Sequence, residues 1–401
     1  MENTKIVIIF YSSPGYVGDA APGMSGGGRI FIESIKRWKK KVGGIEVFTC
    51  PSGKAMLDYN IDCQEGIVTN VLKTPKIFYE SLFFLFLYKT VMGSILSVKR
   101  TFNSDKNTIV FSQADIFPDL IPGFFAKLIN RKVRWVTSFY FFASKPFSKE
   151  FPYRGFSEIV SGSIYYFSQR LCYFLIKKFS DFVLVCNEID IKRFAADKFP
   201  KSQMYPIYGG VDLKEADSVP EPKVKTFDAV FMARFHPQKG PIEAVRVWSE
   251  VVRKNKKAKL VMIGNGPESE KVQKLIHDLG METNISLLGF VDGQKKYKVL
   301  KSAKIFIHSS IYETGGMAAA EGMAARLPVV AFDHAGFDYC YPKGMVRVSP
   351  IGDCKEMAKA ILRLFNDDAL YQEIRHEAYN FSKAWDWDNK ANLLLDKVVK
   401  G

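Results

Sequence analysis

The regular alternation of short apolar runs with amphipathic stretches most constrains the fold of this chain. Each run is four to seven residues long and precedes a longer stretch with helical periodicity, a pattern typical of βαβ units and parallel sheets. Two sets of five strands are expected, at 5–11, 45–49, 108–112, 133–138 and 182–186, and at 228–233, 259–263, 285–288, 305–308 and 328–332. This pattern predicts an α/β protein with two Rossmann-like domains.

A glycine- and proline-rich stretch separates the two sets of strands. Residues 200–225 include Gly209, Gly210 and four prolines, so this stretch is the expected linker between the domains. Ligands of open parallel sheets bind beyond the carboxyl ends of the strands. We therefore expect the two domains to face each other across a deep cleft, with the chemistry in the loops that follow the strands.

Charge and composition narrow the class of partner. The 401 residues carry a net charge of +15, and residues 1–200 hold 27 Lys and Arg against 17 Asp and Glu. A basic surface of this kind attracts phosphates, nucleic acid or anionic lipid.

The longest apolar run, 81–88, ends at Lys89 and is far shorter than the roughly 20 residues of a membrane span. The N-terminus has no signal-peptide pattern, and six scattered cysteines suit reduced cytosolic thiols better than disulfides or a zinc site.

The most informative motif lies within 305–330. A buried strand leads into a polar loop, then Gly315 and Gly316, then an alanine-rich helix that begins near Met317. Free amides at a helix N-terminus favour phosphate. Glu313 and Glu321 flank this point and would repel phosphate, so we interpret them as acceptors for the hydroxyls of a sugar and of a ribose. The alternative is a plain glycine turn with Glu321 on a solvated helix face.

Two further loops carry candidate residues. Arg234 and Lys239 follow the strand at 228–233, and two fixed cations there can neutralise a departing diphosphate. Taken by themselves, they favour the interpretation as ordinary surface cations. A sharp turn after the next strand forms either the wall of a nucleobase pocket or a tight βα turn, and consists of Gly264, Asn265, Gly266 and Pro267.

Together these motifs resemble the second domain of GT-B-fold, family 4 retaining glycosyltransferases, over roughly 209–332 and in the same chain order. The resemblance implies that Arg234 and Lys239 contact the diphosphate of a nucleotide sugar. It further implies that Glu313 and the amides at 315–317 hold the donor sugar and that Glu321 holds the ribose. The family's glycine-rich loop beside the donor phosphates is similar to 25–28, with Gly27 and Gly28; the alternative is a flexible loop before a helix that starts at Arg29.

The same resemblance implies the domains and the reaction. Residues 1–205 would bind the acceptor, residues 206–384 the nucleotide sugar, and a helix from about 385 to 401 would pack back on the first domain. The implied enzyme transfers a hexose-type sugar from a UDP- or GDP-linked donor to an acceptor hydroxyl, with retention, and the leaving diphosphate acts as base. No cofactor is required, and the need for a divalent cation is left open. The alternatives are a non-catalytic donor-binding subunit, a nucleotide-sugar epimerase and a DNA-directed glycosyltransferase.

The chain departs from the family pattern in several places. Family members usually carry an aromatic residue at the position of Gly315, so the sugar pocket is expected to be roomier or differently shaped. Many carry a histidine in the first domain, whereas all five histidines here lie after residue 200; Ser138 and Tyr140 fall near the equivalent strand end. Asp386 and Asp388 have a metal-binding spacing but follow the completed sheet, so no metal site is predicted. His308 is expected to be a core or cleft-edge residue.

The acceptor side shows only a general chemical character. Residues 138–154 interleave aromatic side chains with cations, and the nearly apolar stretch 78–96 is bracketed by lysines. Such patterns suit a lipid-linked acceptor or an anionic membrane surface, with a buried strand and helix as the alternative. A polysaccharide or other glycan acceptor is equally compatible, and no motif favours nucleic acid. We expect a cytoplasmic protein, either free or peripheral on the inner face of the membrane.

Overall fold

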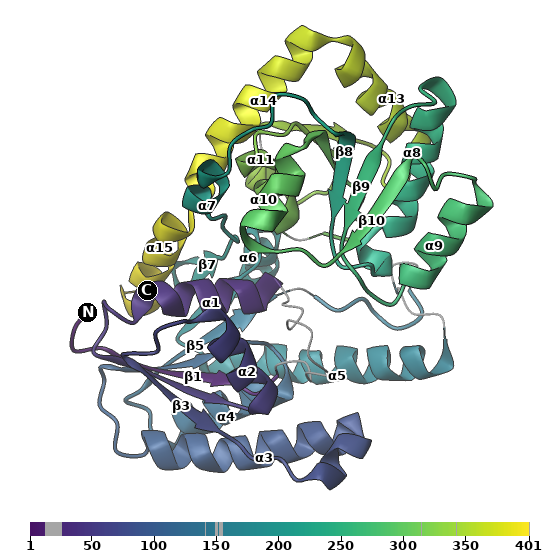
Figure 1. The fold of residues 1–401 in the computed structure, drawn as a ribbon. Coiled ribbons are helices and arrows are strands. Elements are labelled where there is room, and N and C mark those ends of the chain that lie inside the picture. Colours follow the sequence, from purple (N-terminus) through teal and green to yellow (C-terminus); the bar gives the residue numbers. More distant parts are fainter. Residues whose placement is uncertain are drawn as a thin grey trace. The chain divides into compact units, whose positions relative to one another are not determined.

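The computed structural model describes residues 1–12, 26–140, 142–148, 151, 155–313, 315–341 and 343–400. The chain forms two compact units, each an α/β structure with one parallel sheet (Figure 1). Unit 1 consists of Met1–Ile207 and Lys390–Gly401, and unit 2 of Tyr208–Asn389. The chain thus leaves unit 1 once and returns to it at its C-terminal end.

Unit 1 contains a seven-stranded sheet in the order β3-β2-β1-β4-β5-β6-β7, with every neighbouring pair parallel. The inner strands are buried on both faces, which explains their continuous apolar runs. The strands are β1 (Lys5–Phe10), β2 (Gly44–Thr49), β3 (Ile67–Val71), β4 (Thr108–Ser112), β5 (Arg134–Phe139), β6 (Phe182–Val185) and β7 (Met204–Pro206).

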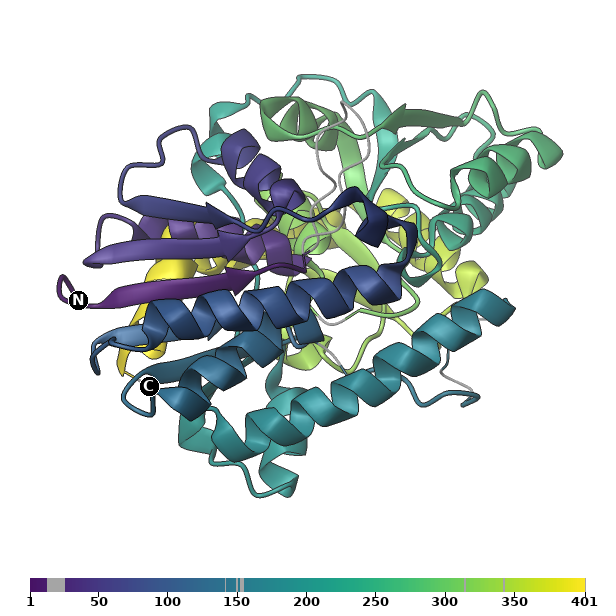
Figure 2. The same ribbon diagram turned by 90° about the horizontal axis from the view of Figure 1, so that it is seen from below.

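Helices cover both faces of this sheet. Figure 2 shows α3, α4 and α5 together on the face of the sheet that is turned to the viewer. On that face, Leu120 of α4 and Ile176 of α5 pack against Val7 and Val110 of the sheet. The helices of unit 1 are α1 (Gly26–Trp38), α2 (Pro51–Asn60), α3 (Leu82–Thr101), α4 (Phe117–Ile129), α5 (Phe156–Phe179), α6 (Glu188–Ala196) and the C-terminal α15 (Trp387–Lys400), with short 3-10 turns η1 (Lys76–Glu80) and η2 (Lys201–Gln203).

Unit 2 contains a six-stranded parallel sheet in the order β10-β9-β8-β11-β12-β13. Apolar side chains form one core cluster on each face of the sheet. The strands are β8 (Phe227–Met232), β9 (Leu260–Ile263), β10 (Ile285–Gly289), β11 (Ala303–His308), β12 (Val329–Phe332) and β13 (Met345–Val348). The helices are α7 (Leu213–Ser218), α8 (Pro241–Lys254), α9 (Ser269–Asp278), α10 (Gly293–Lys301), α11 (Met317–Ala324), α12 (Phe337–Cys340), α13 (Cys354–Asn366) and α14 (Asp368–Ser382), with η3 (Pro237–Lys239) and η4 (Lys383–Trp385).

All ten expected strands occur, but three further strands were not predicted. These are β3 and β7, which form the two edges of the first sheet, and β13, at one edge of the second. Edge strands are short and partly exposed, so their apolar pattern is weak. The prediction of a linker over 200–225 is wrong at its start, because β7 lies inside this range and pairs with β6.

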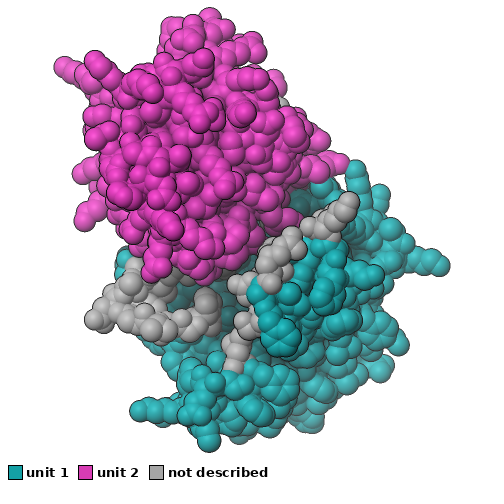
Figure 3. Space-filling model, turned by 90° about the vertical axis from the view of Figure 1, so that its right-hand side faces the viewer, with its two compact units in different colours: residues 1–207, 390–401 teal, residues 208–389 magenta. Residues whose placement is uncertain are grey.

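The chain passes from unit 2 back into unit 1 within its C-terminal segment; Figure 3 colours the two units separately. Within unit 2, Val211 forms a parallel bridge with Asp386. Within unit 1, Trp38 donates a hydrogen bond to the carbonyl oxygen of Ala391 at 2.8 Å, and Arg134 donates one to that of Val398 at 2.9 Å. Helix α15 therefore packs on unit 1 through backbone carbonyls that two side chains recognise.

The two sheets share one topological feature that positions the site. In each sheet the strand order reverses beside the first strand, between β1 and β4 and between β8 and β11. Ligands of open parallel sheets bind at such a switch point, beyond the carboxyl ends of the strands. The loops after these four strands are therefore where a functional site is expected.

Candidate functional site

In unit 2, the loops that follow β8 and β11 are bound to each other by hydrogen bonds. The amides of Ile311 and Tyr312 donate to the carbonyl oxygen of Gln238 at 2.9 and 3.1 Å, and the Ser309 hydroxyl donates to that of Gly240 at 2.7 Å. Gly240 has a φ of +62°, and a Cβ there would lie 1.9 Å from the Ser309 carbonyl oxygen. Only glycine allows this approach, which brings Lys239 to the β11 loop.

Glu313 is the centre of this loop pair. Its side chain is 6% exposed, and its Oε2 lies 2.7 Å from Nζ of Lys239 and 3.3 Å from Nε2 of His308. Its Oε1 accepts a hydrogen bond from the Gly315 amide at 3.3 Å. Burial acts to raise the pKa of Glu313, but Lys239 and His308 outweigh it and hold the pKa well below its usual value. Glu313 is therefore an ionised carboxylate that can accept hydrogen bonds.

The two predicted cations differ in their surroundings. Lys239 is paired with Glu313 and has a side chain that is 35% exposed. Arg234 is exposed, and its guanidinium makes no hydrogen bond or ion pair with any other residue that the structure describes. Loop geometry thus places one cation against the carboxylate and presents the other to solvent.

The turn after β9 supports the Arg234 loop. The Phe235 amide donates to the carbonyl oxygen of Asn265 at 2.9 Å, and the Glu268 amide donates to that of Phe235 at 3.0 Å. Gly264 has a φ of +139°, and a Cβ there would lie 1.8 Å from the Ala233 carbonyl oxygen. The glycines of this turn are thus explained by close backbone packing, while contact with a nucleobase stays a prediction.

The start of α11 is formed by Gly315, Gly316 and Met317, as expected. Gly316 is left-handed, and the Tyr341 hydroxyl lies 2.6 Å from its carbonyl oxygen and 3.0 Å from that of Gly315. A Cβ added to Gly315 would meet nothing within 4 Å. The position where family members carry an aromatic residue is therefore open space in this chain.

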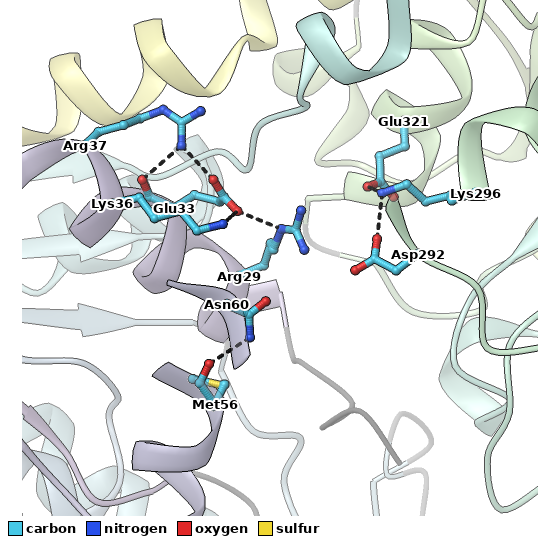
Figure 4. A network of polar contacts seen from close by, with 9 residues as sticks. All are labelled: Arg29, Glu33, Lys36, Arg37, Met56, Asn60, Asp292, Lys296 and Glu321. Carbon is cyan, nitrogen blue, oxygen red and sulfur yellow. Dashed lines mark hydrogen bonds and ion pairs between the residues drawn. The ribbon is translucent and has the colours of Figure 1, made fainter. Parts of the chain in front are cut away.

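Glu321 lies on α11 and forms an ion pair that the sequence analysis missed. Figure 4 shows Lys296 of α10 between Glu321 and Asp292, with Nζ 2.6 Å from the Glu321 carboxylate and 3.2 Å from that of Asp292. Lys296 is 4% exposed as a residue, whereas the Glu321 side chain is 21% exposed. The predicted ribose acceptor is thus held by a buried lysine, for which the spacing of Lys296 along the sequence offered no signal.

In unit 1, the predicted glycine-rich loop is in part a helix. Ser25 lies outside the described residues, but Gly27 and Gly28 belong to the first turn of α1 rather than to a loop, so that placement was wrong. A Cβ on Gly27 would lie 2.5 Å from the ring of Tyr140. Gln113 donates to the Gly27 carbonyl oxygen at 3.1 Å and to the Tyr140 hydroxyl at 2.8 Å. This packing against an aromatic ring explains why glycine stands at the helix start.

The other predicted residue of unit 1, Ser138, lies in β5 and is fully buried. The sequence analysis missed a carboxylate that follows the neighbouring strand β4. It belongs to Asp119, in the first turn of α4. It accepts hydrogen bonds from the amides of Tyr11 and Ser12 at 2.6 and 2.9 Å and from the Ser12 hydroxyl at 2.5 Å. Burial raises the pKa of Asp119 to about 7 despite these donors. Asp119 therefore anchors the chain as it leaves β1.

In helix α1, three basic side chains contact one buried carboxylate of the same helix. Glu33 is 3% exposed and lies 2.6 Å from Arg37, 3.0 Å from Lys36 and 3.4 Å from Arg29 (Figure 4). Burial acts to raise the pKa of Glu33, but these three cations lower it. The basic residues of this helix are consequently tied to one internal carboxylate.

The metal-like spacing at Asp386 and Asp388 has a local explanation. Asp386 accepts a hydrogen bond from the Asp388 amide at 2.9 Å, and Lys214 contacts the Asp388 carboxylate at 3.2 Å. Across the described residues, no group of three or more His, Cys, Asp or Glu is placed to hold a metal ion. Asp386 thus accepts from an amide in the first turn of α15, and Asp388 pairs with a lysine.

Known proteins match this architecture. Residues 214–381 match the family model of group 1 glycosyl transferases. The crystal structure of HepE from Anabaena in complex with UDP-glucose superimposes with a TM-score of 0.71 at 16% identity, covering 99% of each chain. Residues 214–381 therefore carry the sequence pattern of the group 1 glycosyl transferases, and the chain as a whole has the GT-B fold, with units 1 and 2 as its two Rossmann-like halves.

Sequence relatives carry the same family name. A poly(glycerol-phosphate) alpha-glucosyltransferase of Bacillus subtilis is 28% identical over 178 residues, 43% of this chain and 25% of the relative. An uncharacterized glycosyltransferase of Methanocaldococcus jannaschii is 25% identical over 291 residues, 69% of this chain and 70% of the relative. The match to the Bacillus protein therefore spans only a quarter of the length of that relative.

Two further observations concern the helices and the cysteines of the chain. Within the described ranges, no helix has the length and apolar character needed to cross a membrane. Each of the six cysteines carries a free thiol.

Proposed function

We propose that the chain transfers a hexose from UDP-sugar to an acceptor hydroxyl with retention of the anomeric configuration. The observation that carries this proposal is the contact of Lys239 with the ionised carboxylate of Glu313 at the switch point of unit 2. The HepE structure contains UDP-glucose, and the Bacillus relative is named an alpha-glucosyltransferase, which supports UDP as the nucleotide and glucose as a first sugar to test.

The site residues suit the two ends of a nucleotide sugar. Glu313 is ionised and surrounded by donors, so it can accept hydrogen bonds from sugar hydroxyls. Arg234 and Lys239 come from one loop, and their charges can stabilise the diphosphate as its bond to the sugar breaks. Because Lys239 contacts Glu313, neighbouring side chains can hold the sugar and the diphosphate of one donor.

Glu321 is proposed to bind the ribose hydroxyls. Lys296 fixes the orientation of its carboxylate through a contact of 2.6 Å, and part of the Glu321 side chain stays accessible. The leaving diphosphate would serve as the base for the acceptor hydroxyl, so that the protein contributes mainly positioning and charge stabilisation. We propose a glycan or lipid-linked acceptor and a reaction that requires no tightly bound cofactor.

Nucleotide titration tests the donor site. We would measure binding of UDP, GDP, ADP and UDP-glucose by calorimetry to the wild type, to Arg234→Ala and to the control Arg363→Ala, which removes another exposed arginine of unit 2. Selective binding of UDP that weakens at least tenfold in Arg234→Ala alone is expected. Equal weakening in both variants, or no nucleotide binding, would refute the donor site. Binding of UDP-glucose without turnover on any acceptor would instead indicate a donor-binding subunit.

A further inference from the structure

In helix α3 the distribution of polar and apolar residues between the buried and the exposed face is the reverse of that expected at a protein–water surface. Such a helix normally buries its apolar stripe and exposes polar residues. In α3 the buried positions, spaced by four, are Lys89, Gly93, Ser97 and Thr101. The exposed stripe, again spaced by four, consists of Phe83 at 62%, Leu87 at 51%, Val91 at 48% and Ile95 at 54%.

The inward face of α3 is suited to close helix packing. A Cβ on Gly93 would lie 2.6 Å from the ring of Tyr11 and 3.3 Å from Pro122 of α4. Small residues spaced by four let two helix backbones approach closely, as they do between helices surrounded by lipid. The close approach to α4 is thus made by small side chains, with Met92 and Leu96 packed beside them against the core, while the large apolar side chains of the other stripe stay about half exposed.

Helix α5 presents a second apolar stripe on the same face of the unit 1 sheet (Figure 2). Its members recur with a spacing of three or four residues and are 42–66% exposed: Val160, Ile164, Phe167, Leu171 and Phe174. A groove of about 590 Å³ runs beside the N-terminal part of this helix and is lined by further rings, among them Phe117, Phe147 and Phe156. We call the exposed side chains of α3 and α5 the apolar face.

The stretch of chain that carries the apolar face is strongly basic. Residues 73–179 contain 16 Lys and Arg against 6 Asp and Glu, a balance of +10 out of the +15 of the whole chain. Helix α3 itself has no acidic residue; two lysines precede it, and Lys99 and Arg100 are exposed in its last turn. Lys177 and Lys178 occupy the last turn of α5. Cations thus border a surface of aromatic and aliphatic side chains.

We propose that the apolar face docks on an anionic lipid bilayer, with α3 and α5 lying in the plane of its interface. An exposed apolar surface rimmed by Lys and Arg combines burial in the acyl boundary with attraction to anionic headgroups. A second copy of this chain is the less favoured occupant, because it would bring an equally positive surface to the contact. The docking goes beyond the proposed sugar transfer and does not depend on which donor is used.

Vesicle flotation tests the docking. The probes are phosphatidylcholine vesicles with and without about 30% phosphatidylglycerol, at physiological salt. We expect the wild type to float with the anionic vesicles and only weakly with the neutral ones. Leu87→Glu and Phe167→Glu should each lower the apparent affinity at least tenfold. The matched control is Phe290→Glu in unit 2, where the ring is 55% exposed, and it should bind like the wild type.

Three outcomes would overturn the proposal. The wild type does not float with anionic vesicles; Phe290→Glu weakens binding as much as Leu87→Glu does; or the chain forms dimers that Leu87→Glu and Phe167→Glu dissociate, which would make the face a contact between copies. UDP binding, measured on every variant, shows whether unit 2 is folded. A loss of vesicle binding with normal UDP binding therefore separates this proposal from that of sugar transfer.

Discussion

The two units each place a buried carboxylate at the equivalent point of the same topology, but the pKa values of the two carboxylates are shifted in opposite directions. Asp119 follows β4 and Glu313 follows β11, each after the strand that lies beside the first strand at the switch point. Burial raises the pKa of Asp119 to about 7, although the backbone amides and the hydroxyl that donate to it, and the charge of Lys89, act to lower it. Burial acts on Glu313 too, but Lys239 and His308 hold its pKa well below the usual value. The charge of a partner, and not burial alone, decides what a carboxylate can do.

Glu313→Gln should have the largest effect. The amide keeps the shape of the side chain but removes the charge that faces Lys239, so we expect the rate of sugar transfer to fall at least about 100-fold. The same chemical change in unit 1, Asp119→Asn, should lower it less than about tenfold, because Asp119 anchors backbone. UDP release in steady state measures both. Equal losses would remove the functional distinction between the two carboxylates.

Gly264→Ala should have the next largest effect. It tests the close packing between the hydrogen-bonded loops of unit 2. The new Cβ would collide with the Ala233 carbonyl oxygen at a strained φ, so we expect the free energy of unfolding to fall by about 2 kcal/mol or more. Gly315→Ala, with open space around its Cβ, should change it by less than about 0.5 kcal/mol. Urea denaturation compares the two; similar losses would show that the close approach at Gly264 does not matter.

The pH dependence of stability should differ in sign between the two carboxylates. The pKa of Asp119 is about 7 in the folded protein, whereas an Asp carboxyl in the unfolded chain has a pKa of about 4. Between these values the folded state holds more protons, so the free energy of unfolding should fall as the pH rises, with a slope on the order of 1 kcal/mol per pH unit. Folded Glu313 has the lower pKa, so its contribution is present above the unfolded pKa and is lost as the pH falls through the folded one.

Urea denaturation at several pH values measures these slopes. Asp119→Asn should flatten the loss of stability between about pH 4 and 7, and Glu313→Gln should flatten the loss at acid pH. Asp115 and Asp190 also have raised pKa values, about 6 and about 7, so part of the first slope remains. A slope that Asp119→Asn leaves unchanged would contradict the neutral state of this carboxylate.

Asp388→Asn should have the smallest effect. Its ion pair with Lys214 is exposed on both sides, at 46% and 85%, so we expect the free energy of unfolding to change by less than about 0.5 kcal/mol. This exposed pair is the reference against which the buried pair of Lys239 and Glu313 is compared. If a chelator lowered the activity of the wild type and Asp388→Asn removed this sensitivity, the metal interpretation of the Asp-x-Asp spacing would have to be restored.

Most of the sheet architecture could be predicted from the sequence. A parallel strand covered on both faces is apolar along its whole length, so β1, β4 and β11 were evident. Edge strands such as β3 lack this signal, because half of their residues face solvent. The helix start at Gly26 was missed for another reason, since it depends on the Tyr140 ring that packs beneath Gly27.

Part of the candidate site was evident as well. Loops after strands that carry glycine, carboxylates and cations pointed to Arg234, Lys239 and Glu313. Their pairing, the role of Lys296 and the anchoring by Asp119 were not, because these contacts join residues 74, 25 and 108 positions apart. Spacing along the chain does not encode such distances.

The sequence by itself determined the order of strands and helices, the positions of glycines at tight approaches and the chemical types in each loop, since these follow from local periodicity and backbone sterics. Only the tertiary structure decided which carboxylate is charged and which face of α3 is exposed. A pKa depends on partners that folding brings within a few ångströms, and a helix with apolar residues on several sides shows its outward face only once its neighbours have taken the other.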